Sequence, residues 1–449
     1  MKRLKISASY INLGTAASWT VTKMVASFFA TATLTHLAGP GPYSLIAVAL
    51  NLSGLGKLIA DSGFSVWTLT SKTVTPGAAR TAMRSCGRLA LAAGLIATFI
   101  SVGIALKSDF VTTYGPGLVA ICSIAVALPC VLITGLAAVP TAWLQRHRQY
   151  SRVEMAGALS FFLSTGLVVL PMALLAQHRF SLWAVVIQNP LQVLVAFWLV
   201  WRFAKIPKDD HEPVPIDLRY QVGVFSSNLS DYLSNCLDIV LLGLFLKGAG
   251  SIGVYQRALY LAGLPALALI NLLCRASMNK IRETEGIVEK LTVLKKPLTL
   301  LLGCFVILCV PSLVGLDLPR LVLGQKFSMP PHAFMECIIG QACFYTTFLI
   351  GSFLLSIGQQ ERLAKSYAFH ACFLLGLILW MRPTTVEQAM QLYVINGLGR
   401  IGVVILTTAL CLRHKTDLKP QETDHATAEQ EADIEALLLA DVVSSKEHE

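Results

Sequence analysis

Long runs of apolar residues, separated by short polar connections, make up most of the chain. The runs cover approximately residues 8–36, 43–71, 87–106, 117–139, 153–176, 182–203, 219–246, 251–278, 294–315, 332–356, 363–381 and 387–412. Most are close to or longer than the roughly 20 residues that cross a hydrocarbon core as an α-helix. They are apolar on all sides instead of alternating with a period of two, which excludes a transmembrane β-barrel. The pattern therefore predicts an all-α polytopic membrane protein of twelve helices.

Composition agrees with a membrane environment. Of 449 residues, 55% are hydrophobic and 14% are charged, whereas soluble domains carry roughly a quarter charged residues. The eleven cysteines lie mostly inside apolar runs without metal-type spacing, so we expect free thiols that pack as small apolar groups and no metal site. No glycine-rich phosphate loop with its lysine occurs, so we expect neither a built-in ATPase nor a cofactor.

The distribution of Lys and Arg predicts the orientation. The connections on the side of the N-terminus hold 24 of these residues, and the connections on the other side hold six. Because positive residues are retained on the cytoplasmic side, we expect both termini to be cytoplasmic and the protein to lie in the inner membrane. No small-residue cleavage site follows the first apolar run, so we expect that run to remain as the first helix.

Two six-helix halves are predicted, at 1–204 and 219–412, because a polar segment with three prolines at 205–218 separates them. The connections Leu37–Ser44 and Leu246–Gly253 carry glycine at equivalent places in the two halves. Six plus six helices in one orientation indicate parallel repeats, as in transporters that rock two bundles about a central site. The tail, 413–449, carries ten acidic residues; a solvated flexible segment and a docking element both remain open.

A polar stripe runs along the seventh span. Asn228, Asp231, Asn235 and Asp238 recur at spacings of three, four and three, which places them on one face of a helix. A surface that faces lipid would not tolerate this stripe, so it lines a cavity or another helix. Asp238 and Arg257 lie at comparable depth on either side of a turn. A buried ion pair that joins two helices and a direct role in binding substrate or coupling ion both remain open.

Cations occur inside the spans of both halves. They are Lys23, Lys57, Arg257 and Arg400. Only Asp61 offers an acid near the first two, so we expect at least one positive charge to remain unpaired in an aqueous cavity, which suits an anionic ligand. A pyrophosphate between a polyprenol and a sugar chain fits, with arginine holding phosphate oxygens by its fork of donors. Asp61, Asp231 and Asp238 either couple transport to a proton or sodium ion or pair helices.

Several short stretches resemble one family in the same order along the chain. They are His36–Tyr43 with Ala60–Ser65, Leu144–Arg146 with Tyr150, Phe180–Val186, Asn235–Asp238, Gly253–Ala258 and Gly324–Phe327. The chain resembles polysaccharide transporters of the Wzx type, in the multidrug/oligosaccharidyl-lipid/polysaccharide superfamily. The resemblance implies a V-shaped pair of six-helix bundles and alternating access. It also implies an undecaprenyl-pyrophosphate oligosaccharide that moves from the cytoplasmic to the outer leaflet.

The sequence thus predicts a flippase that is not an enzyme. Its candidate substrate-binding residues are Lys23, Lys57, Asn228, Asn235, Tyr255, Arg257 and Arg400. The expected partners are membrane lipids, the lipid-linked oligosaccharide and polysaccharide polymerase or export proteins, without nucleic acid.

Three rivals are weighed against this prediction. A drug or metabolite antiporter of the same superfamily would have a less cationic cavity and deeper acids. A major-facilitator carrier would show a Gly-Asp-Arg-Gly-Arg pattern, which residues 71–88 lack. A membrane-embedded polymerase would need large outer loops, whereas the longest predicted outer loop, 316–331, is short.

Overall fold

A computed structural model describes residues 8–70, 74–107, 109–175, 181–207, 218–248, 250–264, 266, 281, 284, 287–356 and 359–413. The chain divides into two parts, residues 1–404 and 405–449, and the contacts reported below lie within the first. Most of the predicted linker at 205–218 and the acidic tail from residue 414 lie outside the described residues.

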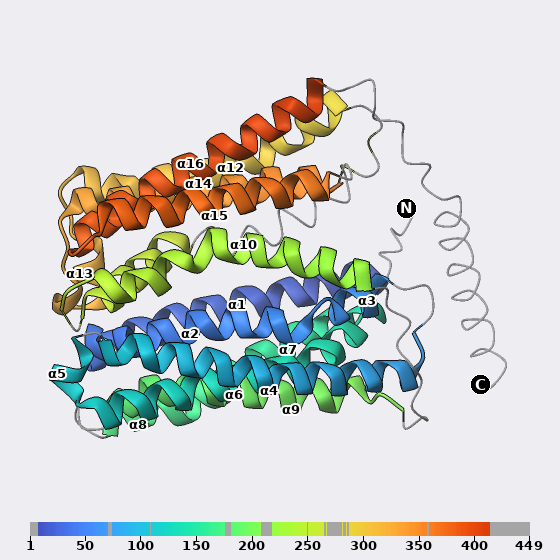
Figure 1. The fold of residues 1–449 in the computed structure, drawn as a ribbon, viewed down its shortest axis with the longest axis horizontal. Helices are drawn as coiled ribbons and strands as arrows, with labels where there is room; N and C mark the ends of the chain where they lie inside the picture. The colour runs from blue at the N-terminus through green and yellow to red at the C-terminus, as the bar shows by residue number, and fades with distance from the viewer. Residues whose placement is uncertain are drawn as a thin grey trace, which may run out of the picture. The chain divides into compact units, whose positions relative to one another are not determined.

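The described chain is helical (Figure 1). In chain order the first half contains α1 (Ala8–Ala38), α2 (Pro40–Asp61), α3 (Phe64–Thr70), α4 (Pro76–Lys107), α5 (Phe110–Tyr114), α6 (Pro116–Arg146), α7 (Tyr150–Phe161), the π-helix η1 (Phe162–Val169), α8 (Leu170–Leu175) and α9 (Ser181–Ala204). The second half contains α10 (Leu218–Phe245), helical residues 251–264, α12 (Ile287–Leu313), α13 (Leu318–Leu323), the 3₁₀ turn η2 (Gln325–Phe327), α14 (Pro331–Ser356), α15 (Gln360–Met381) and α16 (Val386–Arg413).

The predicted all-α membrane fold is confirmed. Within the described residues, nine helices are long and apolar enough to cross a membrane, and no strand occurs there. The seventh predicted span, α10, contributes a shorter apolar stretch among the described residues, Cys236–Phe245. Each of the twelve predicted runs overlaps helical backbone in the described residues, the eighth at 251–264 and 266, which is consistent with the predicted number of spans.

Three predicted spans differ from the helices observed. The run 43–71 is two helices, because Ser62 and Gly63 take positive φ values of 40° and 85° and end α2. The run 153–176 comprises α7, η1 and α8. The third span, α4, begins at Pro76 instead of residue 87, so Arg80 and Arg84, which precede the predicted run, lie on its first turns. Hydropathy marks where a helix becomes apolar, and a helix that extends beyond the apolar layer continues past that point.

The two glycine connections that resemble each other lie against one another. Gly39 and Gly248 adopt positive φ values of 71° and 91°, which glycine tolerates without a steric penalty. The backbone N–H of Gly253 donates a hydrogen bond of 2.5 Å to Ser44 Oγ. We call this end of the helices, where residues 39, 115, 248 and 324 connect them, the turn end, and the opposite end the far end (Figure 1).

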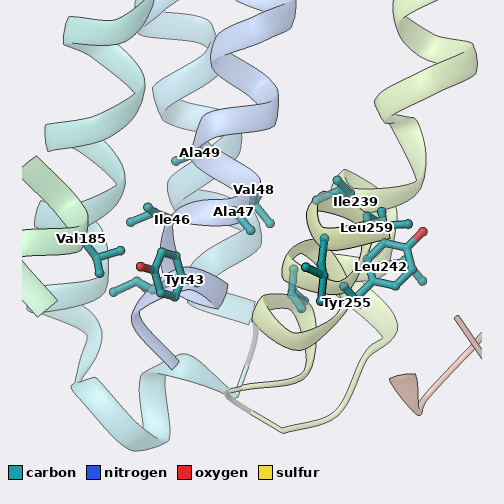
Figure 2. Packing of buried hydrophobic residues seen from close by; sticks show 14 of the residues in the cluster. Tyr43, Ile46, Ala47, Val48, Ala49, Val185, Ile239, Leu242, Tyr255 and Leu259 are labelled. Carbon is teal, nitrogen blue, oxygen red and sulfur yellow. The ribbon is translucent and has the colours of Figure 1, made fainter. Parts of the chain in front are cut away.

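The halves share one buried core near the turn end. Figure 2 shows Ala47 and Val48 of α2 turned toward a group that includes Ile239, Leu242 and Tyr255 of the second half. A Cβ at Gly243 would lie 2.8 Å from Val48 Cγ2, so small residues permit this approach. At the far end, the first half has a core of its own. It is formed by Phe64, Trp67, Val139, Leu144, Leu199 and their neighbours.

Gly253→Val is expected to prevent the halves from closing at the turn end. A Cβ at Gly253 would lie 2.2 Å from the backbone oxygen of Pro40, and a backbone atom cannot move aside as a flexible side chain does. The distance between spin labels at the exposed positions Lys107 and Leu316 should shift to longer values. Gly103→Val is the matched control, because a Cβ there meets no heavy atom within 4 Å. An unchanged distance distribution for a folded Gly253→Val protein would contradict the assignment.

Candidate functional site

Arg257 joins the two halves through an aromatic ring. Its guanidinium carbon lies 3.8 Å from the centroid of the Tyr43 ring, and 5.9 Å from that of Tyr260. Arg257 comes from residues 251–264 and Tyr43 from the first turn of α2. A cation over an aromatic face is attracted by about 0.5–2 kcal/mol, more when both are shielded from water. The Nε of Arg257 is buried without a hydrogen-bond partner among the described residues, so it retains a donor for a ligand.

A cavity of about 250 Å³ opens beside this arginine. It is lined by Gln256, Arg257, Leu259, Tyr260, Gln341 and Tyr345. Ser27 of α1 shares a hydrogen bond of 3.2 Å with the Tyr260 hydroxyl, which brings the first half to a wall of the cavity. The Gln341 side chain donates to the backbone oxygen of Leu259 at 3.1 Å. The cavity therefore combines amides, phenols and one guanidinium.

Lys23 lies one helical turn from Ser27 on the same face of α1, about 6 Å along the helix axis. A Cβ at Gly157 would lie 3.5 Å from Lys23 Nζ, so the ammonium reaches toward α7. Thr20, on the same face, donates a hydrogen bond of 3.2 Å to Glu154. This face of α1 thus contacts Glu154 of α7 at one end and Tyr260, a lining residue of the cavity, at the other, and Lys23 lies between the two contacts.

Lys57 and Asn228 lie on helix faces that approach each other. Tyr232 of α10 donates a hydrogen bond to the backbone oxygen of Asn51 in α2, and a Cβ at Gly54 would lie 2.9 Å from the Tyr232 ring. Lys57 is one turn beyond Gly54 toward the far end and is exposed. Asn228 is one turn beyond Tyr232 in the same direction. The two residues therefore follow the α2–α10 contact on its far-end side.

Asp238 is bound to Tyr255 instead of Arg257. The Tyr255 hydroxyl donates a hydrogen bond of 2.6 Å to Asp238 Oδ2, and both side chains are buried, at 0% and 1% exposure. Positions 255 and 257 differ by roughly 200° around a helix. One consequently faces the core of the second half, and the other faces Tyr43. The ion pair between Asp238 and Arg257 that the sequence left open is therefore wrong.

Asp61 caps a helix. Its carboxylate accepts hydrogen bonds from the backbone N–H and the hydroxyl of Ser65, at 2.8 Å and 2.5 Å. This satisfies a backbone donor in the first turn of α3, as N-terminal caps do. The side chains of Asp231 and Asn235, which the stripe also includes, lie outside the described part of α10.

Arg400 lies between two rings within the second half. Its guanidinium carbon lies 4.8 Å from the ring centroids of both Phe344 and Tyr367, and only 2% of its surface is exposed. Packed aromatic rings cover the guanidinium in this conformation. Arg400 therefore does not line the cavity at Arg257.

Sequence reasoning missed His370. This fully buried histidine of α15 bonds Ser234 of α10 through Nδ1 at 2.7 Å and the backbone oxygen of Asn396 in α16 through Nε2 at 3.1 Å. A carbonyl oxygen only accepts, so Nε2 carries a proton. A histidine inside an apolar span is itself a signal, because such residues are costly in a bilayer. Here it fastens three helices.

The family of polysaccharide biosynthesis proteins matches residues 33–282, which is more than half of the chain. This chain belongs to the polysaccharide biosynthesis protein family. The match includes Tyr43, Asp238 and Arg257 and ends before α12. No curated protein matches the chain.

Solved structures show the fold that this family member adopts. The lipid II flippase MurJ, in an inward closed conformation, superimposes with a TM-score of 0.69 at 12% identity, covering 88% of this chain and 87% of that one. A multidrug resistance MATE transporter of the MOP superfamily, facing inward, gives 0.57 at 13% identity over 93% and 100%. The same kind of transporter facing outward gives 0.56 at 15% identity over 93% and 98%. These likenesses show that the chain adopts the fold of these transporters.

The two roles open for Asp61 give different results on substitution. If the carboxylate serves as the cap of α3, Asp61→Asn should keep nearly all stability and transport, because asparagine also caps helices. Asp61→Ala should lose about 0.5–2 kcal/mol. Thermal unfolding in detergent measures both. Loss of transport in Asp61→Asn at unchanged stability would instead identify Asp61 as a coupling residue.

Tyr255→Phe is expected to destabilise the protein by about 1–3 kcal/mol, because it removes the donor to a buried carboxylate. Tyr43→Phe is the matched control. The Tyr43 hydroxyl is buried without a hydrogen-bond partner among the described residues, so its removal should cost little while the ring beneath Arg257 remains. Thermal unfolding of both variants side by side provides the measurement. Equal effects would show that the Asp238 bond contributes no stability.

Proposed function

We propose that the protein moves a polyprenyl-pyrophosphate-linked oligosaccharide from the inner to the outer leaflet for polysaccharide synthesis. The observation that carries this proposal is a cavity lined by Arg257, with a second cation, Lys23, on the neighbouring helix α1. Arg257 belongs to the second half, and Lys23 of the first half lies one turn from Ser27, whose hydroxyl shares a hydrogen bond with the lining residue Tyr260. A pyrophosphate in such a cavity is held from two sides that move relative to each other.

The chemistry of Arg257 suits a phosphate. Stacking over Tyr43 fixes the plane of the guanidinium without using its hydrogen-bond donors, and Nε remains buried and unpartnered among the described residues. Charge-assisted bonds from arginine to phosphate are among the stronger contacts in proteins. The phenols and amides of the lining suit the hydroxyls of a sugar.

The closed turn end supports the proposed direction. The halves share a buried core there, whereas Lys57, beyond the α2–α10 contact, is exposed. Since positive residues gather on the cytoplasmic side, we assign the far end to the cytoplasm. The substrate would then enter from the inner leaflet past Lys57 and Asn228 and leave when the turn end opens.

The sequence lacks an ATP-binding loop. The driving energy in the proposed cycle therefore comes from an ion gradient, or from removal of the product outside by a polymerase or export protein. The alternative is an antiporter, which the MATE-like fold favours. The family match and the cationic cavity favour the flippase. In neither function is the protein an enzyme.

Lys23→Gln and Arg257→Gln are each expected to weaken binding of a polyprenyl pyrophosphate by roughly tenfold or more, because each removes a contact of about 1.5–3 kcal/mol to a charged group. Arg257→Lys should be intermediate, since it keeps the charge but loses the planar fork. Binding is titrated in detergent, and leaflet exchange is then followed in proteoliposomes.

The matched control is Lys365→Gln, which removes an exposed lysine paired with Glu361 on one helix. It should leave binding and exchange unchanged. Retention of full affinity by the double variant Lys23→Gln/Arg257→Gln would refute the pyrophosphate site. Selective efflux of small organic cations by a wild-type protein that does not bind polyprenyl pyrophosphate would establish the antiporter.

A further inference from the structure

A second cationic pocket lies at the far end of the first half, away from the cavity at Arg257. It has a volume of about 410 Å³ and lies between the start of α4 and the end of α9. It is lined by Arg80, Trp201, Arg202, Lys205, Ile206 and Pro207. Among the described residues that line it, three of six are cations and none is an acid. Like charges gathered in one concavity repel one another, so an anion that binds there relieves the repulsion.

The pocket is built by a backbone turn. Lys205 takes a positive φ of 40° directly after α9, the conformation in which many helices end. Ile206 is then buried in the far-end core of the first half, and its carbonyl accepts a hydrogen bond of 2.9 Å from Arg80. The Nε of Arg80 is buried without a hydrogen-bond partner among the described residues. The arginine is thus held by one nitrogen, and a second donor remains unused.

The helix dipole explains the position of only some of these three cations. Cations at the end of a helix, such as Arg202 and Lys205 after α9, interact favourably with its last carbonyls. Arg80 lies near the start of another helix, α4, where the dipole disfavours a positive charge. Dipole effects therefore do not explain why all three cations meet.

Tryptophan side chains place the pocket at the membrane surface. Trp198 and Trp201 of α9 are 60% and 42% exposed, and exposed tryptophans gather where the acyl chains meet the headgroups. A ligand in the pocket would have its phosphate beside Arg80, Arg202 and Lys205 and its acyl chains along the apolar side of α9. Basic pockets between transmembrane helices on the cytoplasmic side bind anionic headgroups in this way.

We propose that this pocket binds the headgroup phosphate of an anionic diacyl phospholipid from the inner leaflet. The site is separate from the pyrophosphate cavity and rests only on the proposed orientation, in which the far end is cytoplasmic. It lies at the end of α9, directly before the segment that connects the two halves in the sequence.

The test is native mass spectrometry of the full-length protein titrated with phosphatidylglycerol and, separately, with phosphatidylcholine. The wild-type protein should bind phosphatidylglycerol preferentially. Arg202→Gln/Lys205→Gln, which changes two exposed side chains, should weaken that binding by roughly tenfold, since each cation near the surface contributes to attraction of an anionic lipid. Arg148→Gln/Arg152→Gln removes two exposed cations at the same end and should bind as the wild type does. Equal binding by all three proteins would overturn the proposal.

Further arms separate the alternative ligands. Glycerol phosphate, which has no acyl chains, should not displace the lipid at millimolar concentration. Displacement by it would overturn the assignment to a lipid. Asp209→Asn/Asp210→Asn tests whether the adjoining acids of the chain compete. If phosphatidylglycerol binds only after that change, the ligand of the pocket is an acidic side chain of the protein and the proposal fails. Lys23→Gln/Arg257→Gln should retain phosphatidylglycerol binding whether or not it retains polyprenyl pyrophosphate.

Discussion

A positive charge inside a bilayer is costly unless another group stabilises it, and the ring of Tyr43 stabilises Arg257. The partner comes from the other half of the molecule, and an aromatic ring offers attraction without neutralising the charge. An acid in the same place would pair with the arginine and weaken its attraction for the anionic substrate that we propose. A ring keeps the cation in place, holds the halves together and leaves hydrogen-bond donors for a ligand.

Close approach of the two halves depends on small residues around that contact. Gly253 binds Ser44 through its backbone, and Gly243 admits Val48. Neither contact leaves space for a β-carbon without movement of its neighbour. Interfaces of this kind in membranes rely on packing, because the lipid is as apolar as the side chains and supplies no hydrophobic driving force. Such an interface separates at modest cost, which the proposed transport cycle requires.

Three other ionisable groups in the described part of the second half make contacts within that half. Asp238 accepts a hydrogen bond from Tyr255, His370 bonds Ser234 and Asn396, and Arg400 lies between Phe344 and Tyr367. These contacts fasten neighbouring helices, since an unpaired polar group in a bilayer costs several kcal/mol.

The sequence by itself determined the all-helical membrane fold, the approximate positions of its spans and the family, because apolar length and local motifs are properties of contiguous residues. It also placed cations in both halves. It did not determine helix ends, as the break at Ser62 and Gly63 and the early start of α4 show, because hydropathy is insensitive to backbone geometry. Only the tertiary structure decided partners. Asp238 and Arg257 lie at similar depth but do not pair. Positions 255 and 257 face different directions on their helix, so Tyr255 bonds Asp238 while Arg257 lies over Tyr43. The contacts of His370 and the pocket at Arg80 are formed by segments far apart in the sequence. No local sequence pattern predicts that these segments lie close together.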